Sequence, residues 1–393
     1  MKLTFPPDFI FGTSTAAYQI ETAVDHDWLG HKSKDGYVFE RTSDHELRLK
    51  EDAAIIAYCG GMYRMSLQWS KLQRQPFADF DTVIVKEYVD FLEDLKARGV
   101  KIMMVLHHFT NPTWFAAKGG WERSENIPMW VDFCKKVEAN FGDYVAYWNT
   151  FNEPNVYASN GWVLGEFPPY KKNLPKAFTV IANLGKAHDI VYDYLKARRP
   201  NQPIGISHNC VAFTAENWLG VLPAKISDWW FMDYTLSKFH NKLDFFGLSY
   251  YARISHDPLP ITYLDTPEKF IKYNKPHDGM WEYYPVGLKE SMKRYWQKYK
   301  LPLFITESGI CTNDDTVRVA AMKDYVKLVH ECVVEGIPVL GYLWWSTFDN
   351  FEWNLGPTFR FGLYETDLTT KDRIKRPGAD VFHRLAYEKE IEI

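Results

Sequence analysis

The sequence lacks the features that mark metal-binding, nucleic-acid-binding and membrane-spanning proteins. Its five cysteines show no CxxC spacing and no Cys/His cluster, so a zinc site has little support. With 46 Lys and Arg against 50 Asp and Glu, the formal charge is −4, without the basic excess that nucleic-acid binding requires. No segment approaches about 18 uninterrupted apolar residues. We therefore expect no metal, no cofactor, no nucleic-acid partner and no membrane span.

The cysteines and the first residues bear on the compartment. An odd number of cysteines without paired spacing is typical of buried free thiols in a reducing environment; they are Cys59, Cys134, Cys210, Cys311 and Cys332. The segment Met1–Pro7 lacks the apolar core of a signal peptide. These features predict a cytoplasmic protein. The sequence leaves the oligomeric state open and is compatible with a homo-oligomer.

Aromatic residues are the abundant class. They make up 17% of the chain and include 15 Trp, within a composition that is 46% hydrophobic and 24% charged. The balance of apolar and charged residues is that of a folded globular protein. So many indole rings suit a large core, and they also suit a site that stacks against flat apolar faces such as those of sugars.

Short apolar runs alternate with longer amphipathic stretches along the whole chain. Apolar residues recur at helical spacing from Val85 to Leu95, Gly99 follows as a helix stop, and Ile102–Leu106 is apolar on both faces, as in a buried parallel strand. Further helices are predicted through 131–141 and 177–197. The eight predicted strands are Phe9–Phe11, Tyr63–Leu67, Ile102–Leu106, Val145–Phe151, Ile204–Ile206, Phe245–Tyr250, Leu303–Thr306 and Val339–Trp345.

Eight strands alternating with helices, without a Pro-, Ser- or Gly-rich linker, favour an α/β fold with one (β/α)8 TIM barrel. We expect residues 1–393 to form this single catalytic domain. An open doubly wound sheet is the alternative, but no GxGxxG segment follows the first predicted strand.

Polar side chains gather where these strands end, which is where a barrel carries its active site. Glu153 and Glu307 each come after a predicted strand and a threonine. A single carboxylate at a strand end is usually a solvated cap or an ion-pair partner. Two of them, with further polar and aromatic residues at other strand ends, predict a catalytic site; these others are Gln19, Arg64, His108, Asn152, Tyr251, Trp345, Glu352 and Trp353.

Four segments in order along the chain carry a family resemblance. They are Phe9–Glu21, Thr150–Pro154, Ile305–Gly309 and Asp349–Trp353. These segments resemble the opening signature, the acid/base motif, the nucleophile motif and the sugar-binding motif of family 1 glycoside hydrolases, the β-glucosidase family. The resemblance runs from about residue 5 to residue 385. It implies a barrel enzyme that hydrolyses small-molecule β-glycosides.

The resemblance implies a role for each glutamate. Glu153 would be the acid/base and Glu307 the nucleophile of a retaining double displacement at terminal β-D-glucosyl residues, with galactosyl or fucosyl residues left open. Glycoside cleavage of this kind needs one acid and one carboxylate on opposite sides of the scissile bond, about 5–5.5 Å apart. We expect the charge of Glu307 to raise the pKa of Glu153 and keep it protonated.

The resemblance also implies supporting roles. Arg64 and Tyr251 would hold Glu307 ionised and oriented, as an always-charged guanidinium and a phenol donor can. Asn152 would bind the 2-hydroxyl, and Trp345 would form the floor on which the sugar stacks. The ring of donors and acceptors around the sugar hydroxyls would be Gln19, His108, Asn152, Glu352 and Trp353.

Two alternatives stay open. Members of the 6-phospho-β-glycosidase branch carry a Ser, then Lys and Tyr after the last strand to bind the phosphate, but residues 352–361 contain no Lys and Glu352 would repel a phosphate. A non-catalytic carbohydrate-binding barrel would usually lack one of the two glutamates. Ser249 and Ser308 depart from the family pattern, which has Asn at both positions.

The chain is also shorter than typical members between Glu21 and Asp44. A shortened wall there predicts an open cleft beyond the sugar pocket, lined by aromatic residues from other loops. The residues expected to line it are Trp162, Phe167 and Trp281. This cleft would favour aromatic aglycones over a second glucose.

Overall fold

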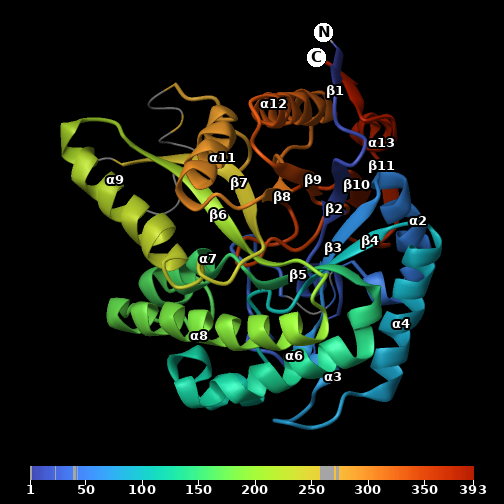
Figure 1. Ribbon diagram of the computed structural model, residues 1–393, viewed down its shortest axis with the longest axis vertical. Helices are drawn as coiled ribbons and strands as arrows, with labels where there is room; N and C mark the ends of the chain where they lie inside the picture. The colour runs from blue at the N-terminus through green and yellow to red at the C-terminus, as the bar shows by residue number, and fades with distance from the viewer. Residues whose placement is uncertain (1, 23, 39–40, 42, 257–269, 271–273) are drawn as a thin grey trace.

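The computed structural model describes residues 2–22, 24–38, 41, 43–256, 270 and 274–393. Eight parallel strands form a closed barrel in the order β2-β3-β4-β5-β6-β7-β8-β9 (Figure 1). The barrel strands are β2 (Ile10–Ser14), β3 (Met62–Ser66), β4 (Lys101–Val105), β5 (Val145–Asn152), β6 (Ile204–Ala215), β7 (Phe245–His256), β8 (Leu303–Ser308) and β9 (Val339–Trp345). The (β/α)8 barrel expected from the sequence is confirmed.

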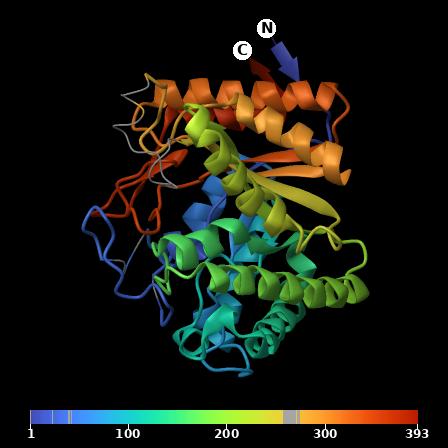
Figure 2. The same cartoon turned by 90° about the vertical axis from the view of Figure 1, so that its left-hand side faces the viewer.

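Helices follow the strands, with the long ones covering the outer face of the barrel and the short ones lying in the loops. They are α1 (Ala17–Ile20), α2 (Leu49–Cys59), α3 (Trp69–Leu72), α4 (Thr82–Ala97), α5 (Thr113–Ala117), α6 (Ile127–Phe141), α7 (Pro154–Ala158), α8 (Leu174–Arg198), α9 (Val221–Asp228), α11 (Val286–Tyr299), α12 (Asp315–Val334) and α13 (Pro377–Glu388). Neighbouring helices pack in pairs, α6 on α8 and α11 on α12 (Figure 2).

Local sequence signals explain where the long helices begin. Asp81 accepts hydrogen bonds from the backbone N–H groups of Val83 and Ile84, which caps α4. Asn173 caps α8 and Asp314 caps α12 in the same way. The predicted helices through 85–95, 131–141 and 177–197 lie within α4, α6 and α8.

The inside of the barrel is filled by a separate layer of side chains. Its members are buried and come from five strands: Met62, Met103, Phe245, Phe304 and Leu343. Because side chains of a strand alternate between its two faces, a residue two positions further along also points into the barrel. Arg64 therefore follows Met62 inward, and Trp345 follows Leu343, one layer closer to the C-terminal ends of the strands.

Two small antiparallel sheets were not predicted from the sequence. Strand β1 (Lys2–Thr4) pairs with β12 (Glu390–Glu392), which places the two chain ends side by side (Figure 1). Strand β10 (Tyr364–Thr366) pairs with β11 (Arg373–Lys375). Strands of three residues show too little alternation to stand out in a sequence.

All five cysteines are free and buried, as the sequence predicts. Within the described ranges, no helix combines the length and apolarity needed to cross a bilayer. Among the same residues, no three His, Cys, Asp or Glu side chains are grouped so that they could hold a metal ion.

Candidate active site

Glu307 lies near the end of β8, where the regular pairing with the neighbouring strands breaks. The register shifts between Leu248 and Ser249 against β7, and again before Ser308 against β9. An irregularity of this kind re-aims a side chain. The carboxylate of Glu307 accepts hydrogen bonds from Arg64 Nη1 at 2.6 Å and from the Tyr251 hydroxyl at 2.9 Å.

Arg64 lies beneath Glu307 and is fully buried, at 0% exposure. Its second terminal nitrogen donates to Asn152 Oδ1 at 2.5 Å and to Ser207 Oγ at 3.0 Å. One guanidinium thus links residues from β3, β5, β6 and β8. The planar fork of arginine suits this task, because it can serve several acceptors at fixed angles and remains charged when buried.

Glu153 lies just beyond β5 in a strained backbone conformation. Its φ is 40° and its ψ is 60°, the left-handed region that non-glycine residues seldom occupy. Pro154 follows as the first residue of α7, and a proline restricts the backbone of the residue before it. Asn209 Nδ2 donates to Glu153 Oε1 at 2.9 Å, and the backbone N–H of Glu153 donates to Ser207 O at 2.7 Å.

The two carboxyl groups have raised pKa values. Burial is the largest cause for Glu153, followed by the charge of Glu307, and together they raise its pKa to about 8. The sequence indicated only the charge of Glu307, whereas burial of the carboxyl group, the larger contribution, depends on the folded structure. Burial also raises the pKa of Glu307, while Arg64 and the hydroxyl of Tyr251 act in the opposite direction. Glu153 is therefore mostly protonated at neutral pH.

Asn152 and His108 are oriented by Arg64. A guanidinium can only donate, so the Asn152 atom that faces it is the carbonyl oxygen Oδ1. The amide nitrogen of Asn152 then faces His108 Nε2 at 2.9 Å, which makes Nε2 the acceptor and leaves the ring proton on Nδ1. Burial lowers the pKa of His108 well below its usual value, so the ring is neutral. His108 thus has a free N–H donor at Nδ1, which no described residue accepts.

The loop after β9 supplies a third carboxylate. Gln19, on α1, donates from Nε2 to Asn350 Oδ1 at 3.0 Å, to Phe351 O at 2.9 Å and to Glu352 Oε2 at 3.3 Å. Burial and the charge of Glu307 raise the pKa of Glu352 to about 8, against the opposing effect of Gln19. Trp353 continues the loop and packs against Tyr18 with ring centroids 5.3 Å apart.

These side chains line one pocket of about 890 Å³ at the C-terminal ends of the strands. Nine of the ten site residues expected from the sequence line it directly: Gln19, His108, Asn152, Glu153, Tyr251, Glu307, Trp345, Glu352 and Trp353. Arg64 is the tenth, and it reaches the pocket only through Glu307 and Asn152. No Lys or Arg of the described part of the chain lines this pocket.

Apolar side chains line the outer part of the pocket, and they include two of the three aromatic residues expected from the sequence. Phe167 and Trp281 line it, together with Val211 and Ile254 from the extended ends of β6 and β7. Trp162 does not line it. Its ring is buried, and its Nε1 donates to Glu122 Oε1 at 2.9 Å, because the segment 159–164 turns inward as a π-helical turn.

Among the described residues, Asn209 is a polar pocket residue that contacts Glu153 and was not expected from the sequence. The predicted fifth strand ended at Ile206, whereas β6 continues to Ala215. Beyond Ile206 the sequence reads Ser207-His208-Asn209, which breaks the apolar run. No local sequence signal marks Asn209, because its pairing with Ser249 on β7 appears only in the folded structure.

The family model for glycosyl hydrolase family 1 matches residues 1–216 and 226–391. The chain belongs to glycoside hydrolase family 1. It is a glycoside hydrolase of the β-glucosidase type, as the resemblance of its four motifs implied.

Two relatives and two solved structures match over nearly their whole length. A 6-phospho-beta-galactosidase of Clostridium acetobutylicum is 27% identical, with 98% of each chain covered. Beta-glucosidase A of Thermotoga maritima is also 27% identical, with 99% of each chain covered. Among solved structures, a beta-glycosidase from Pyrococcus horikoshii has a TM-score of 0.89 at 31% identity, covering 100% of this chain and 97% of that one. The T. maritima beta-glucosidase in complex with deoxynojirimycin has a TM-score of 0.90 at 25% identity, covering 99% and 100%.

Proposed function

We propose that this family 1 enzyme is a retaining β-glycosidase that releases terminal non-reducing β-D-glucosyl residues, with residues 1–393 acting as one catalytic domain. Glu307 would attack the anomeric carbon while Glu153 protonates the leaving oxygen. The observation that carries the proposal is the different environment of the two carboxyl groups. Arg64 and Tyr251 both donate to Glu307, whereas Glu153 has a pKa of about 8 and one amide donor.

The same pair serves the second half of the reaction. Once Glu307 forms an ester with the sugar, its negative charge disappears, so one cause of the raised pKa of Glu153 is removed. Glu153 has passed its proton to the leaving oxygen in the first step, and with its pKa lowered it stays ionised until it accepts a proton from water, which attacks the anomeric carbon from the side of the departed aglycone. Two displacements on opposite faces retain the anomeric configuration.

The remaining pocket residues support binding of the glycone. Asn152 faces the pocket next to Glu307, where it would contact the 2-hydroxyl, an interaction that strengthens in oxocarbenium-like transition states. His108 would donate from Nδ1 to a neighbouring hydroxyl. Trp345 would stack against the sugar ring. The carboxyl group of Glu352 and the amide of Gln19 would bind the glycone hydroxyls that lie farthest from the scissile bond.

A neutral sugar fits the pocket better than a phosphorylated one. A 6-phosphate would need a cation, and the described lining contains none. Arg360, the cation next in sequence to the sugar-binding motif, donates to Asp349 and not into the pocket. A non-catalytic binding barrel is disfavoured because both glutamates line the same cavity. A cytoplasmic location stays a prediction of the sequence.

Two measurements test the proposal. Release of nitrophenol should be much faster from 4-nitrophenyl β-glucoside than from its 6-phosphate, and the reverse order would favour a phosphoglycosidase. NMR of the first-formed sugar should show the β-anomer, because a double displacement retains configuration. Early appearance of the α-anomer would overturn the two-glutamate mechanism, and no turnover of either substrate would favour the binding barrel.

A further inference from the structure

Asp349 lies in the loop that follows β9, on the side away from the sugar pocket. Glu352 and Trp353 of this loop line the pocket, whereas Asp349, Asn350 and Phe351 line a second cavity behind it. The loop therefore separates the sugar pocket from the second cavity. Its position determines where Glu352 stands in the pocket.

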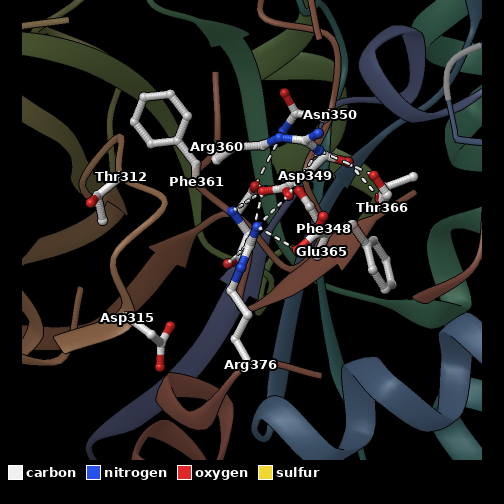
Figure 3. Close-up of polar contacts among 12 residues, drawn as sticks. Thr312, Asp315, Phe348, Asp349, Asn350, Arg360, Phe361, Glu365, Thr366 and Arg376 are labelled. Carbon is white, nitrogen blue, oxygen red and sulfur yellow. Dashed lines mark hydrogen bonds and ion pairs between the residues drawn. The ribbon is translucent and has the colours of Figure 1, made fainter. Parts of the chain in front are cut away.

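Every polar group of Asp349 has a partner. Its carboxylate takes a two-pronged contact from Arg376, with Nη1 to Oδ1 at 2.9 Å and Nη2 to Oδ2 at 2.7 Å (Figure 3). Arg360 Nη1 adds a hydrogen bond to Oδ2 at 3.2 Å, and the backbone N–H of Gly362 donates to Oδ1 at 2.8 Å. The backbone of Asp349 is fixed as well, by Tyr364 O and by the hydroxyl of Thr366.

The contacts of Asp349 hold the loop to elements outside the barrel. Arg376 immediately precedes α13, and Arg360 and Gly362 belong to the segment that leads to β10. A buried carboxylate held by two guanidinium groups has little freedom to move, because moving it away from both would leave its buried charge unpaired. These contacts therefore clamp the loop on its side away from the sugar pocket.

The clamped loop in turn orients Gln19. All three hydrogen bonds of the Gln19 amide with the loop involve its nitrogen, Nε2. The opposite atom, Oε1, is buried and accepts no hydrogen bond from a described residue, although Gln19 lines the pocket. Rotating the amide by 180° would bring two oxygens, Asn350 Oδ1 and Phe351 O, against Oε1, which is unfavourable. The loop therefore decides that Gln19 presents an acceptor to the sugar.

We propose that Asp349, clamped by Arg376 and Arg360, is a positioning residue that sets Gln19 and Glu352 for the hydroxyl groups at the far end of the glycone, the 4-hydroxyl in particular. The inference rests on the proposed glycosidase function. Asp349 itself touches no substrate, because it does not line the sugar pocket. Its effect should therefore depend on whether the substrate carries the hydroxyl that Gln19 and Glu352 bind.

The experiment measures kcat/KM of the wild type and of Asp349→Asn on two substrates. They are 4-nitrophenyl β-glucoside and its 4-deoxy analogue, which have the same leaving group. Asparagine keeps the shape of the side chain but loses the charge and turns an N–H group toward a guanidinium. We expect kcat/KM for the glucoside to fall by about 10- to 100-fold, the usual effect of disturbing a hydrogen bond to a charged group. For the 4-deoxy analogue we expect a fall of about threefold or less, because the contact is already missing.

Asp315→Asn is the matched control. Asp315 also binds a buried guanidinium, from Arg318 Nη1 at 2.6 Å, and it accepts from the backbone N–H of Gly378 in α13, but it makes no contact with the loop (Figure 3). It should change both substrates equally. Arg376→Lys provides a second route to the same answer if Asp349→Asn does not fold, since it keeps the charge but loses the two-pronged contact.

The outcomes are distinguishable. Equal losses on both substrates in Asp349→Asn, or in Arg376→Lys, would mean that the cluster only stabilises the fold, and would overturn the inference. A wild-type enzyme that turns over neither substrate would contradict the proposed function itself, and the inference would fall with it. A selective loss on the glucoside, with the control equal on both, supports the positioning role.

Discussion

The amide nitrogen of Asn209 donates a hydrogen bond to Oε1 of Glu153 at 2.9 Å. This contact opposes the two causes that raise the pKa of Glu153, burial and the charge of Glu307. A donor favours the ionised carboxylate, which in the proposed mechanism is the form that activates water in the second half of the reaction. Asn209 therefore works against protonation of Glu153 and in favour of its action as a base.

Removing this donor should shift the pH dependence of activity. In Asn209→Ala the pKa of Glu153 should rise further above about 8. If cleavage needs protonated Glu153, as proposed, kcat/KM should fall as the pH rises through that pKa, and this basic limb should move to higher pH in the variant. The shift is measured as the pH dependence of kcat/KM on a substrate with a poor leaving group. Asn160→Ala is the control, since Asn160 lines the pocket without a recorded hydrogen bond to Glu153, and its profile should not move.

The two glutamates should respond in opposite ways to azide. Glu307→Ala should abolish turnover, and azide should restore formation of an α-glycosyl azide, because the small anion occupies the face that the nucleophile vacates. Glu153→Ala should still react with activated aryl glycosides, whose leaving groups need little protonation, and azide should then yield the β-product. The anomers are assigned by NMR. If they are exchanged, the two roles are reversed.

Arg64, the charged donor to Glu307, should contribute more to kcat than Tyr251, the neutral donor. Arg64→Lys keeps a positive charge but cannot reach Glu307, Asn152 and Ser207 together, so we expect kcat to fall by about 100-fold or more. Tyr251→Phe removes one hydrogen bond to a charged group, and should lower kcat by about 10-fold. Single-turnover kinetics with an aryl glucoside compares the two variants. A larger loss in Tyr251→Phe would contradict the ranking.

Glu352 should make the folded protein less stable at alkaline pH. Its pKa is raised to about 8 in the folded protein, so the folded state holds its proton more tightly than the unfolded chain does. Stability from this group is fully present below the unfolded pKa of about 4.3 and is lost as pH rises through about 8. Urea unfolding at several pH values should show a shallower loss in Glu352→Gln than in the wild type. Equal slopes would show that Glu352 does not contribute.

The apolar outer wall should favour aromatic leaving groups. Trp281 lines the pocket, and its ring lies 5.1 Å from Tyr251 and 6.1 Å from Phe361. Trp281→Ala should reduce kcat/KM for aryl β-glucosides more than for methyl β-glucoside, by about fivefold, since stacking contributes about 0.5–1.5 kcal/mol. Trp218→Ala is the control, because Trp218 is 80% exposed and does not line the pocket. Equal effects of the two variants on the aryl substrates would contradict this role.

The sequence predicted the barrel well because each strand is a compact apolar run between helices. It failed at the far ends of β6 and β7, which continue to Ala215 and His256. There the strands run past the barrel and pair with each other, so their side chains need not be uniformly apolar. Strand pairing outside a core is decided by tertiary contacts, which no local pattern records.

The same limit applies to the site. Residues within motifs, such as Glu153 and Glu307, could be named from their positions at strand ends, since a barrel brings those ends together. The contact of Asn209 with Glu153 could not, because it depends on where β6 ends. The size of the burial contribution to the pKa of Glu153 also depends on how deeply the pocket closes around it, and that is a property of the packed loops.

The five buried thiols can be used to measure local unfolding of the protein, because each becomes reactive only when its segment opens to solvent. Burial raises the pKa of every one of them, to about 12 for Cys210 and about 11 for Cys332, so the reactive thiolate is scarce in the folded state. Each thiol sits in a different part of the chain, on α2, α6, β6, α12 and the segment after β8. The rate at which a maleimide labels each position would therefore map which segments of the barrel separate first, without any engineered probe.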